Sequence, residues 1–180
     1  EWVEPGQAVL LHDGRIKGRV EAVEEGRVVF TVEEGGILTS GKKMVLPGVP
    51  LPLPLLTQRD WEGLETGLSA GAAFVALSFV QRGKDVEEVR RALSARGFHP
   101  WLIAKLESQV AVDHREEIWR AADGVMVARG DLGVEIPPEE LPLLQKELVK
   151  EGLFHGKPVI IATEMLESMT TQNRPTRAEA

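Results

Sequence analysis

The sequence predicts an α/β fold in which a short all-β unit precedes helices that alternate with buried strands. Residues 1–48 contain β-rich runs separated by Gly turns, whereas residues 57–180 alternate between helical patterns and short apolar runs. Between them, residues 49–56 are rich in proline, which suits neither a helix nor an inner strand. We therefore expect a β domain at 1–48, a linker at 49–56 and an α/β domain at 57–180.

In the β unit, the apolar run 7–11 ends at the turn His12-Asp13-Gly14, and residues 16–21 then alternate between apolar and polar. Gly26 marks a second turn before the β-rich run 27–32. Short strands joined by tight turns indicate a small barrel or a meander.

The second unit begins with a helix that Thr57 can cap and that ends near Gly71, because its apolar residues recur at helical spacing. Helices alternating with nearly all-apolar strands are typical of parallel βα units, and periodicity alone leaves an open sheet and half of an eight-stranded barrel both possible. The expected strands are 72–80, 101–106, 125–128 and 159–163, and the expected helices after the first are 85–96, 112–122 and a helical region at 138–155.

Composition excludes several classes of protein. The chain has 180 residues, a net charge of −7 without long runs of one sign, and no cysteine, so nothing indicates nucleic-acid binding, membrane-surface binding or disulfides. No apolar run approaches the roughly 20 residues of a membrane span, and no signal peptide precedes the first strand, so we expect a cytoplasmic protein. Because the chain starts without Met and stops inside an apparently helical stretch, 174–180, we expect it to be an excerpt of a longer one.

The segment 123–137 carries the first candidate site. The buried strand 125–128 runs into Arg129-Gly130-Asp131 and so delivers a carboxylate to its carboxyl end, where barrel enzymes keep their chemistry. Gly130 lets the backbone approach a ligand, and if a helical turn starts here, its free N–H groups would point at an anion. The alternative is a Gly turn followed by a solvated Asp131.

Two further strand ends carry polar groups. Lys105 and Glu107 lie two residues apart, so in a strand they point to one face and could hold a phosphate and its metal ion; the alternative is a structural salt bridge. Thr163 ends the last strand, and its hydroxyl could bind a carboxylate, although a strand threonine bonded to backbone is the commoner case. Ser78, after an earlier strand, could line the site as well, but we expect it to be a small buried residue.

Four stretches in chain order resemble the pyruvate kinase family. MVARGDLGVEIP at 126–137 closely resembles the family's metal-binding segment, and the match continues in SFVQRGKDVEEVR at 78–90, IAKLES at 103–108 and KPVIIATEMLESMTTQNRPTRAEA at 157–180. The resemblance implies part of a parallel (β/α)8 TIM barrel, the A domain, preceded by part of a small all-β barrel-like cap, the B domain.

The resemblance also implies roles for these residues. Lys105 would stabilise the developing enolate and the phosphoryl group, and Glu107 and Asp131 would bind Mg²⁺ or Mn²⁺. The backbone of Gly130 and Asp131 would bind the substrate carboxylate, and Thr163 would lie beside the reacting methylene carbon.

Five positions, at three places in the chain, depart from the family pattern. Ser108 replaces the usual Asn, and Glu164 replaces the usual Gln. In the β unit, Lys42 resembles a lysine that contacts nucleotide phosphate, but residues 43–45 depart from the family's Gly-Val-Asn.

The resemblance implies phosphoryl transfer from phosphoenolpyruvate to ADP, giving pyruvate and ATP in the last step of glycolysis. It also implies use of K⁺, whose ligands lie on strands outside this sequence, and assembly as a homotetramer. One alternative is a metal-dependent lyase or aldolase acting on a pyruvate-like enolate. Another is a catalytically incomplete scaffold, and we expect the 180 residues alone to be inactive because half a barrel exposes two sheet edges.

Overall fold

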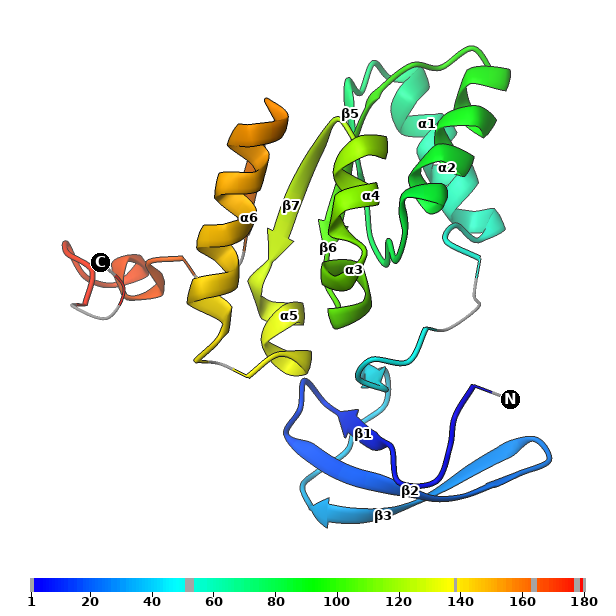
Figure 1. Cartoon of the computed structure of the whole chain (residues 1–180), viewed down its shortest axis with the longest axis vertical. Coiled ribbons are helices and arrows are strands. Elements are labelled where there is room, and N and C mark those ends of the chain that lie inside the picture. Colours follow the sequence, from blue (N-terminus) through cyan, green and yellow to red (C-terminus); the bar gives the residue numbers. More distant parts are fainter. Residues whose placement is uncertain (1, 51–53, 138, 163–164, 177–178, 180) are drawn as a thin grey trace.

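The structure, a computed structural model, describes residues 2–50, 54–137, 139–162, 165–176 and 179. It contains a four-stranded antiparallel sheet near the N-terminus and a four-stranded parallel sheet covered by helices in the remainder. Figure 1 shows the antiparallel sheet beside helix α5, beyond the ends toward which strands β6 and β7 point. This arrangement confirms the predicted α/β fold with an all-β unit in front.

The antiparallel sheet has the strand order β3-β2-β1-β4. The first three strands follow one another as a meander, and β4 adds to the free edge of β1, where Leu11 pairs with Met44. The two-residue strand β4 was not predicted, because it is too short to show a pattern. The strands are β1 (Ala8–Leu11), β2 (Ile16–Glu24), β3 (Arg27–Glu34) and β4 (Met44–Val45).

Helix α1 (Gln58–Ser69) opens the second unit with the capping box expected from Thr57. The Thr57 side chain accepts from the Asp60 backbone N–H at 3.3 Å, and the Asp60 carboxylate accepts from the Thr57 N–H at 2.7 Å. These reciprocal bonds satisfy two backbone donors that helix geometry leaves free. Leu64 and Leu68 then pack the apolar side of the helix against the core.

The parallel sheet runs in chain order, β5-β6-β7-β8, with β5 and β8 at its edges in the part of the chain that the structure describes. Its strands are β5 (Phe74–Leu77), β6 (Trp101–Leu106), β7 (Gly124–Ala128) and β8 (Val159–Ala162). Sequential parallel strands with helical crossovers are the pattern of a barrel wall, and these four do not close a barrel. The connecting helices are α2 (Gly83–Ala95), α3 (Gln109–Asp113), α4 (Arg115–Ala121), α5 (Arg129–Glu135) and α6 (Leu141–His155).

Several element boundaries differ from the sequence-based expectation; α2, for example, begins at Gly83 rather than at residue 85. The strand predicted over 72–80 ends at Leu77, because Phe79 turns the backbone with a φ of 59°. The helix predicted over 112–122 is divided into α3 and α4 at His114, whose φ of −103° and ψ of 15° lie outside the helical range. The region 138–155 becomes helical at Leu141.

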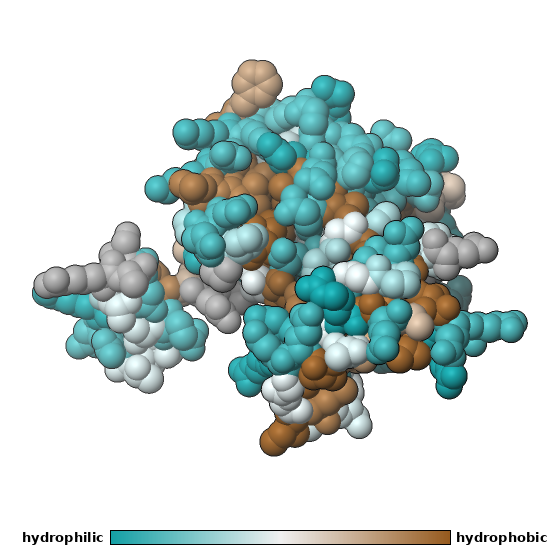
Figure 2. All heavy atoms as spheres, turned by 60° about the horizontal axis from the view of Figure 1, so that its bottom comes forward, coloured by the Kyte–Doolittle hydropathy of each residue, from teal (hydrophilic) through white to brown (hydrophobic). Residues whose placement is uncertain are grey.

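The two faces of the parallel sheet differ in burial. Val75, Leu77 and the alternate residues of the neighbouring strands are packed under the helices and form the main core. On the other face Phe74, Trp101 and Ile160 are exposed, and Lys105 lies on this same face by strand alternation and register. Figure 2 shows apolar residues exposed among charged ones when the bottom of the molecule is turned forward.

Trp119 anchors the helical layer. Its ring is fully buried, its Nε1–H donates to the Glu151 carboxylate at 3.0 Å, and it stacks on the His155 ring with centroids 5.6 Å apart. Arg115 donates to the other oxygen of Glu151 at 2.9 Å. The carboxylate therefore joins α4 to α6 with both oxygens used.

The C-terminal segment follows β8 as a 3-10 helix, η1 (Glu167–Thr170), and forms the small lobe that stands apart in Figure 2. Hydrogen bonds from Ser168 and Thr176 lower the pKa of Glu179 to about 2. The helix expected over 174–180 is absent from its described residues, 174–176 and 179. Among the described residues, no helix has the length and apolarity needed to cross a membrane.

Gly83 and Gly63 should respond in opposite ways to alanine. A Cβ at Gly83 would lie 2.6 Å from the Glu117 carbonyl oxygen, so Gly83→Ala should lower the free energy of unfolding by about 1–3 kcal/mol. A Cβ at Gly63 in α1 meets nothing within 4 Å, so Gly63→Ala should raise it by about 0.5–1 kcal/mol through helix propensity. Urea unfolding followed by circular dichroism measures both, and equal effects would contradict the packing of α2 against α4.

Candidate active site

Lys105 and Glu107 lie side by side at the carboxyl end of β6. The Lys105 Nζ is 2.5 Å from the Glu107 Oε1, and their side chains are 24% and 6% exposed. The alternation of the strand thus brings an ammonium and a carboxylate together, as the two-residue spacing predicts. A structural salt bridge would show the same contact, so the catalytic roles of both residues stay predictions.

The loop after β5 completes the surroundings of this pair. Lys105 Nζ donates to the Ser78 hydroxyl at 2.9 Å, and the Phe79 backbone N–H donates to the second oxygen of Glu107 at 2.9 Å. The expectation for Ser78 was wrong, because its side chain is half-buried and hydrogen-bonded to Lys105. Phe79 holds a left-handed backbone conformation that is uncommon for a residue with a side chain, and such conformations cluster at functional sites.

Asp131 lies in the first turn of α5, which begins directly after β7. The helical turn that the sequence left open therefore exists at this strand end. The Asp131 Oδ1 accepts from the Lys43 Nζ at 2.7 Å, and the same ammonium lies 5.2 Å from the centroid of the Phe79 ring. Because the Phe79 N–H binds Glu107, Lys43 links the surroundings of Asp131 to those of the Lys105–Glu107 pair.

The structure places Lys43 against the site, whereas the sequence singled out its neighbour. Lys42 is exposed, and its proposed contact with nucleotide phosphate stays a prediction. Two adjacent lysines carry no pattern that tells which one faces a partner 88 positions later in the chain. The departure of residue 43 from the family's Gly was the signal that could have drawn attention to it.

A cleft of about 120 Å³ lies where the segment around β4 meets the carboxyl end of the parallel sheet. Glu135 forms part of its wall and accepts from the Gln109 backbone N–H at 2.9 Å. Burial raises the pKa of Glu135, and this effect exceeds the lowering by hydrogen bonds and by Lys43. The polar residues of the lining are Lys43, Gln81, Glu107, Ser108 and Glu135, and the apolar ones are Met44, Val45, Leu46, Val49, Phe79 and Val110.

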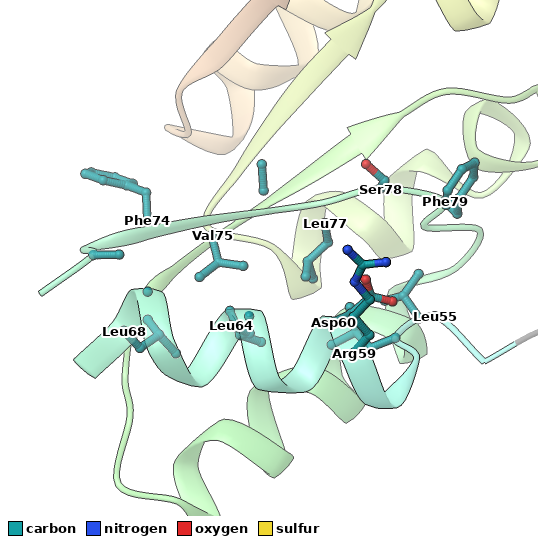
Figure 3. Close-up of a pocket in the computed structure, with 15 residues that line it drawn as sticks. Leu55, Arg59, Asp60, Leu64, Leu68, Phe74, Val75, Leu77, Ser78 and Phe79 are labelled. Atoms are coloured by element: carbon teal, nitrogen blue, oxygen red, sulfur yellow. The ribbon is translucent and has the colours of Figure 1, made fainter. Parts of the chain in front are cut away.

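A larger hollow, of about 640 Å³, lies between α1 and β5. Figure 3 shows Val75 and Leu77 pointing toward Leu64 of α1, while Ser78 points to the opposite side of β5. The hollow is lined mainly by apolar side chains, so the charged groups that could carry chemistry do not gather in it.

Glu107 and Asp131, the two predicted metal ligands, are oxygen donors of the kind that Mg²⁺ prefers. The two carboxylates follow adjacent parallel strands, since Leu106 pairs with Val127. Mg²⁺ prefers oxygen ligands and usually takes one or two protein carboxylates, with water and substrate oxygens completing its shell. Among the residues that the structure describes, no group of three or more His, Asp or Glu side chains offers a fuller protein cage.

Three further positions were singled out from the sequence. Thr163, the candidate substrate contact, and Glu164 lie outside the described residues. Ser108, which replaces the family's Asn, caps α3 by accepting from the Ala111 backbone N–H at 3.2 Å. Its hydroxyl therefore has a structural partner of its own.

The fold and the site together define a portion of an α/β barrel enzyme with charged groups gathered at the strand ends. A family model described as pyruvate kinase, barrel domain, matches residues 1–180. The chain belongs to the pyruvate kinase family.

Individual relatives agree with this assignment. The chain is 50% identical to the pyruvate kinase of Agrobacterium vitis, covering 100% of this chain and 37% of the relative. It is 49% identical to the pyruvate kinase of Geobacillus stearothermophilus, covering 99% and 31%. The crystal structure of a pyruvate kinase from Cryptosporidium parvum superposes with a TM-score of 0.92 at 38% identity, covering 98% of this chain and 38% of that one. The chain thus spans about a third of the length of these relatives.

Glu135 should make stability depend on pH. Because its folded-state pKa is raised above 4.5, the folded chain keeps a proton that the unfolded chain releases, so stability falls as pH rises through this window. Glu135→Gln keeps an acceptor for the Gln109 N–H and cannot ionise, so the variant should gain stability relative to the native chain between pH 4 and pH 7. Urea midpoints at both pH values test this, with the exposed Glu147→Gln on α6 as the control. The same pH dependence in native and variant chains would contradict it.

Proposed function

We propose that the complete protein carrying this sequence is a pyruvate kinase that transfers a phosphoryl group from phosphoenolpyruvate to ADP. The observation that best supports this proposal is that Lys105 lies beside Glu107, with Asp131 after the neighbouring strand, in a chain of this family. In this reaction the bond from phosphorus to the enol oxygen breaks, and a bond to a terminal phosphate oxygen of ADP forms. The enolate left behind takes a proton at its methylene carbon and becomes pyruvate.

Lys105 acts on the charge that moves during transfer. Its side chain is three-quarters buried, and Ser78 and Glu107 fix the position of its ammonium, so little reorganisation is needed when negative charge develops on the enol oxygen. A preorganised cation in a partly dry site stabilises such charge far better than one in water.

Glu107 and Asp131 would hold the divalent cation, Mg²⁺ or Mn²⁺. When bound there, the cation neutralises phosphoryl oxygens and orients them. The Phe79 N–H keeps one oxygen of Glu107 in place, which aims the carboxylate even though it is buried.

The remaining substrate contacts rest on family membership. The backbone N–H groups of Gly130 and Asp131, in the first turn of the seven-residue α5, bind the substrate carboxylate. Thr163 would lie beside the reacting methylene carbon, and Lys42 would contact the nucleotide phosphates. Membership also supports K⁺ as a second cation, a homotetramer and a cytoplasmic location. The domain division at 1–48, 49–56 and 57–180 accords with the two sheets and belongs to this proposal.

Lys105→Met provides the main test. In the complete protein, turnover of phosphoenolpyruvate and ADP with Mg²⁺ and K⁺, coupled to lactate dehydrogenase, should fall by about 100- to 1,000-fold in kcat. The exposed Lys146→Met on α6 removes the same charge elsewhere and should leave turnover unchanged. The 180-residue chain alone should show no turnover.

Other outcomes would point to the two rival functions. Pyruvate release from an enolate-forming substrate without any need for ADP would favour a metal-dependent lyase or aldolase. A complete protein that binds Mn²⁺ but turns over neither kind of substrate would favour a scaffold.

A further inference from the structure

We propose that Lys43 is a tethered cation that occupies Asp131 until a divalent cation displaces it. This inference rests on the proposed function for the cation site, and it assigns to Lys43 a role in setting the affinity of that site. Lys43 would be a positioning residue, since it acts through Asp131.

The contact itself is direct. The Lys43 Nζ lies 2.7 Å from Asp131 Oδ1, at the distance of a charge-assisted hydrogen bond. Both side chains are only partly exposed, at 39% and 40%, so the pair is neither fully solvated nor locked in the core. Such a pair can be exchanged for another cation at modest cost.

The second candidate ligand is neutralised in the same way. Glu107 is paired with Lys105, so each carboxylate of the site already has an ammonium counter-ion in the same chain. The two lysines differ in what holds them. Lys105 lies two residues before its partner, in β6, and donates to Ser78 as well, whereas Lys43 lies just before β4 of the antiparallel sheet.

Displacement of Lys43 from Asp131 would also affect the antiparallel sheet, because the Lys43 backbone is bonded to it. The Lys43 carbonyl accepts from the His12 N–H at 3.1 Å, and the next residue begins β4, which pairs with β1. While it is paired with Asp131, the ammonium lies 5.2 Å from the Phe79 ring centroid, and both Lys43 and Phe79 line the cleft. Once released, it could bind an anionic ligand in that cleft. Since coupling is reciprocal, whatever holds Lys43 away from Asp131 should tighten cation binding.

Cation affinity gives the first test. Mn²⁺ titration of the complete protein, followed by electron paramagnetic resonance, should give a dissociation constant about 2- to 5-fold lower in Lys43→Met than in the native protein. Lys43→Arg, which keeps a charged partner for Asp131, should stay near the native value. The matched control is Lys17→Met, because Lys17 is paired with Glu34 at 3.0 Å on the same sheet. An unchanged constant in Lys43→Met, or an equal change in Lys17→Met, would overturn the proposal.

Acylation of lysines gives a second test that needs no variant at position 43. Saturating Mn²⁺ should speed the modification of Lys43 by an amine-reactive reagent about 2- to 5-fold, measured by mass spectrometry, and leave Lys17 unchanged. In Asp131→Asn, Lys43 should react at the faster rate without any cation. Equal rates with and without bound Mn²⁺ would overturn the proposal.

The two tests separate this inference from the proposed function. If Mn²⁺ binds and depends on Glu107 and Asp131 but Lys43 responds in neither test, only the role of Lys43 fails. If no Mn²⁺ binds the native protein, the cation site and the role of Lys43 both fail.

Discussion

A buried carboxylate needs an ion-pair or hydrogen-bond partner for each of its oxygens. The contacts that provide these partners for Glu107 determine much of this structure. It is the one charged residue that is buried among those the structure describes. Lys105 neutralises one of its oxygens and the Phe79 N–H satisfies the other. Without them, burying the charge would cost several kcal/mol. The parallel register of β5 and β6 brings the two partners to the same place, and the left-handed turn at Phe79 aims the N–H.

The β unit meets this site at α5, and also at Phe79. Lys43 reaches Asp131, the turn at Gly14 faces Val134, and Glu135 lies beside the segment that leaves β4. One seven-residue helix thus presents a candidate metal ligand and also the surface against which the β unit rests. A change in what Asp131 binds is therefore placed to alter how the two units meet.

Short sequence patterns were sufficient to predict the structure wherever it depends on contacts between residues close in the sequence. The capping box at Thr57, the strand over 101–106 and the pairing of Lys105 with Glu107 all follow from short spacings. The turn at Phe79 and the contact of Lys43 with Asp131 involve partners in distant segments, so no short window contains them. The break at His114 left no signal in the helical pattern of residues 112–122. The proposed chemical roles came from resemblance of whole motifs, because a lysine beside a glutamate is by itself only an ion pair.

Trp119 also has a spectroscopic consequence. The chain has four tryptophans, of which Trp119 is fully enclosed, whereas Trp2 and Trp101 are exposed and Trp61 is half-buried under Arg96. Indole emission shifts to longer wavelength in water, so the blue part of the intrinsic fluorescence should come from Trp119. A red shift of that component would report loosening of α4 from α6, while quenching of the remainder by iodide would report on the surface alone.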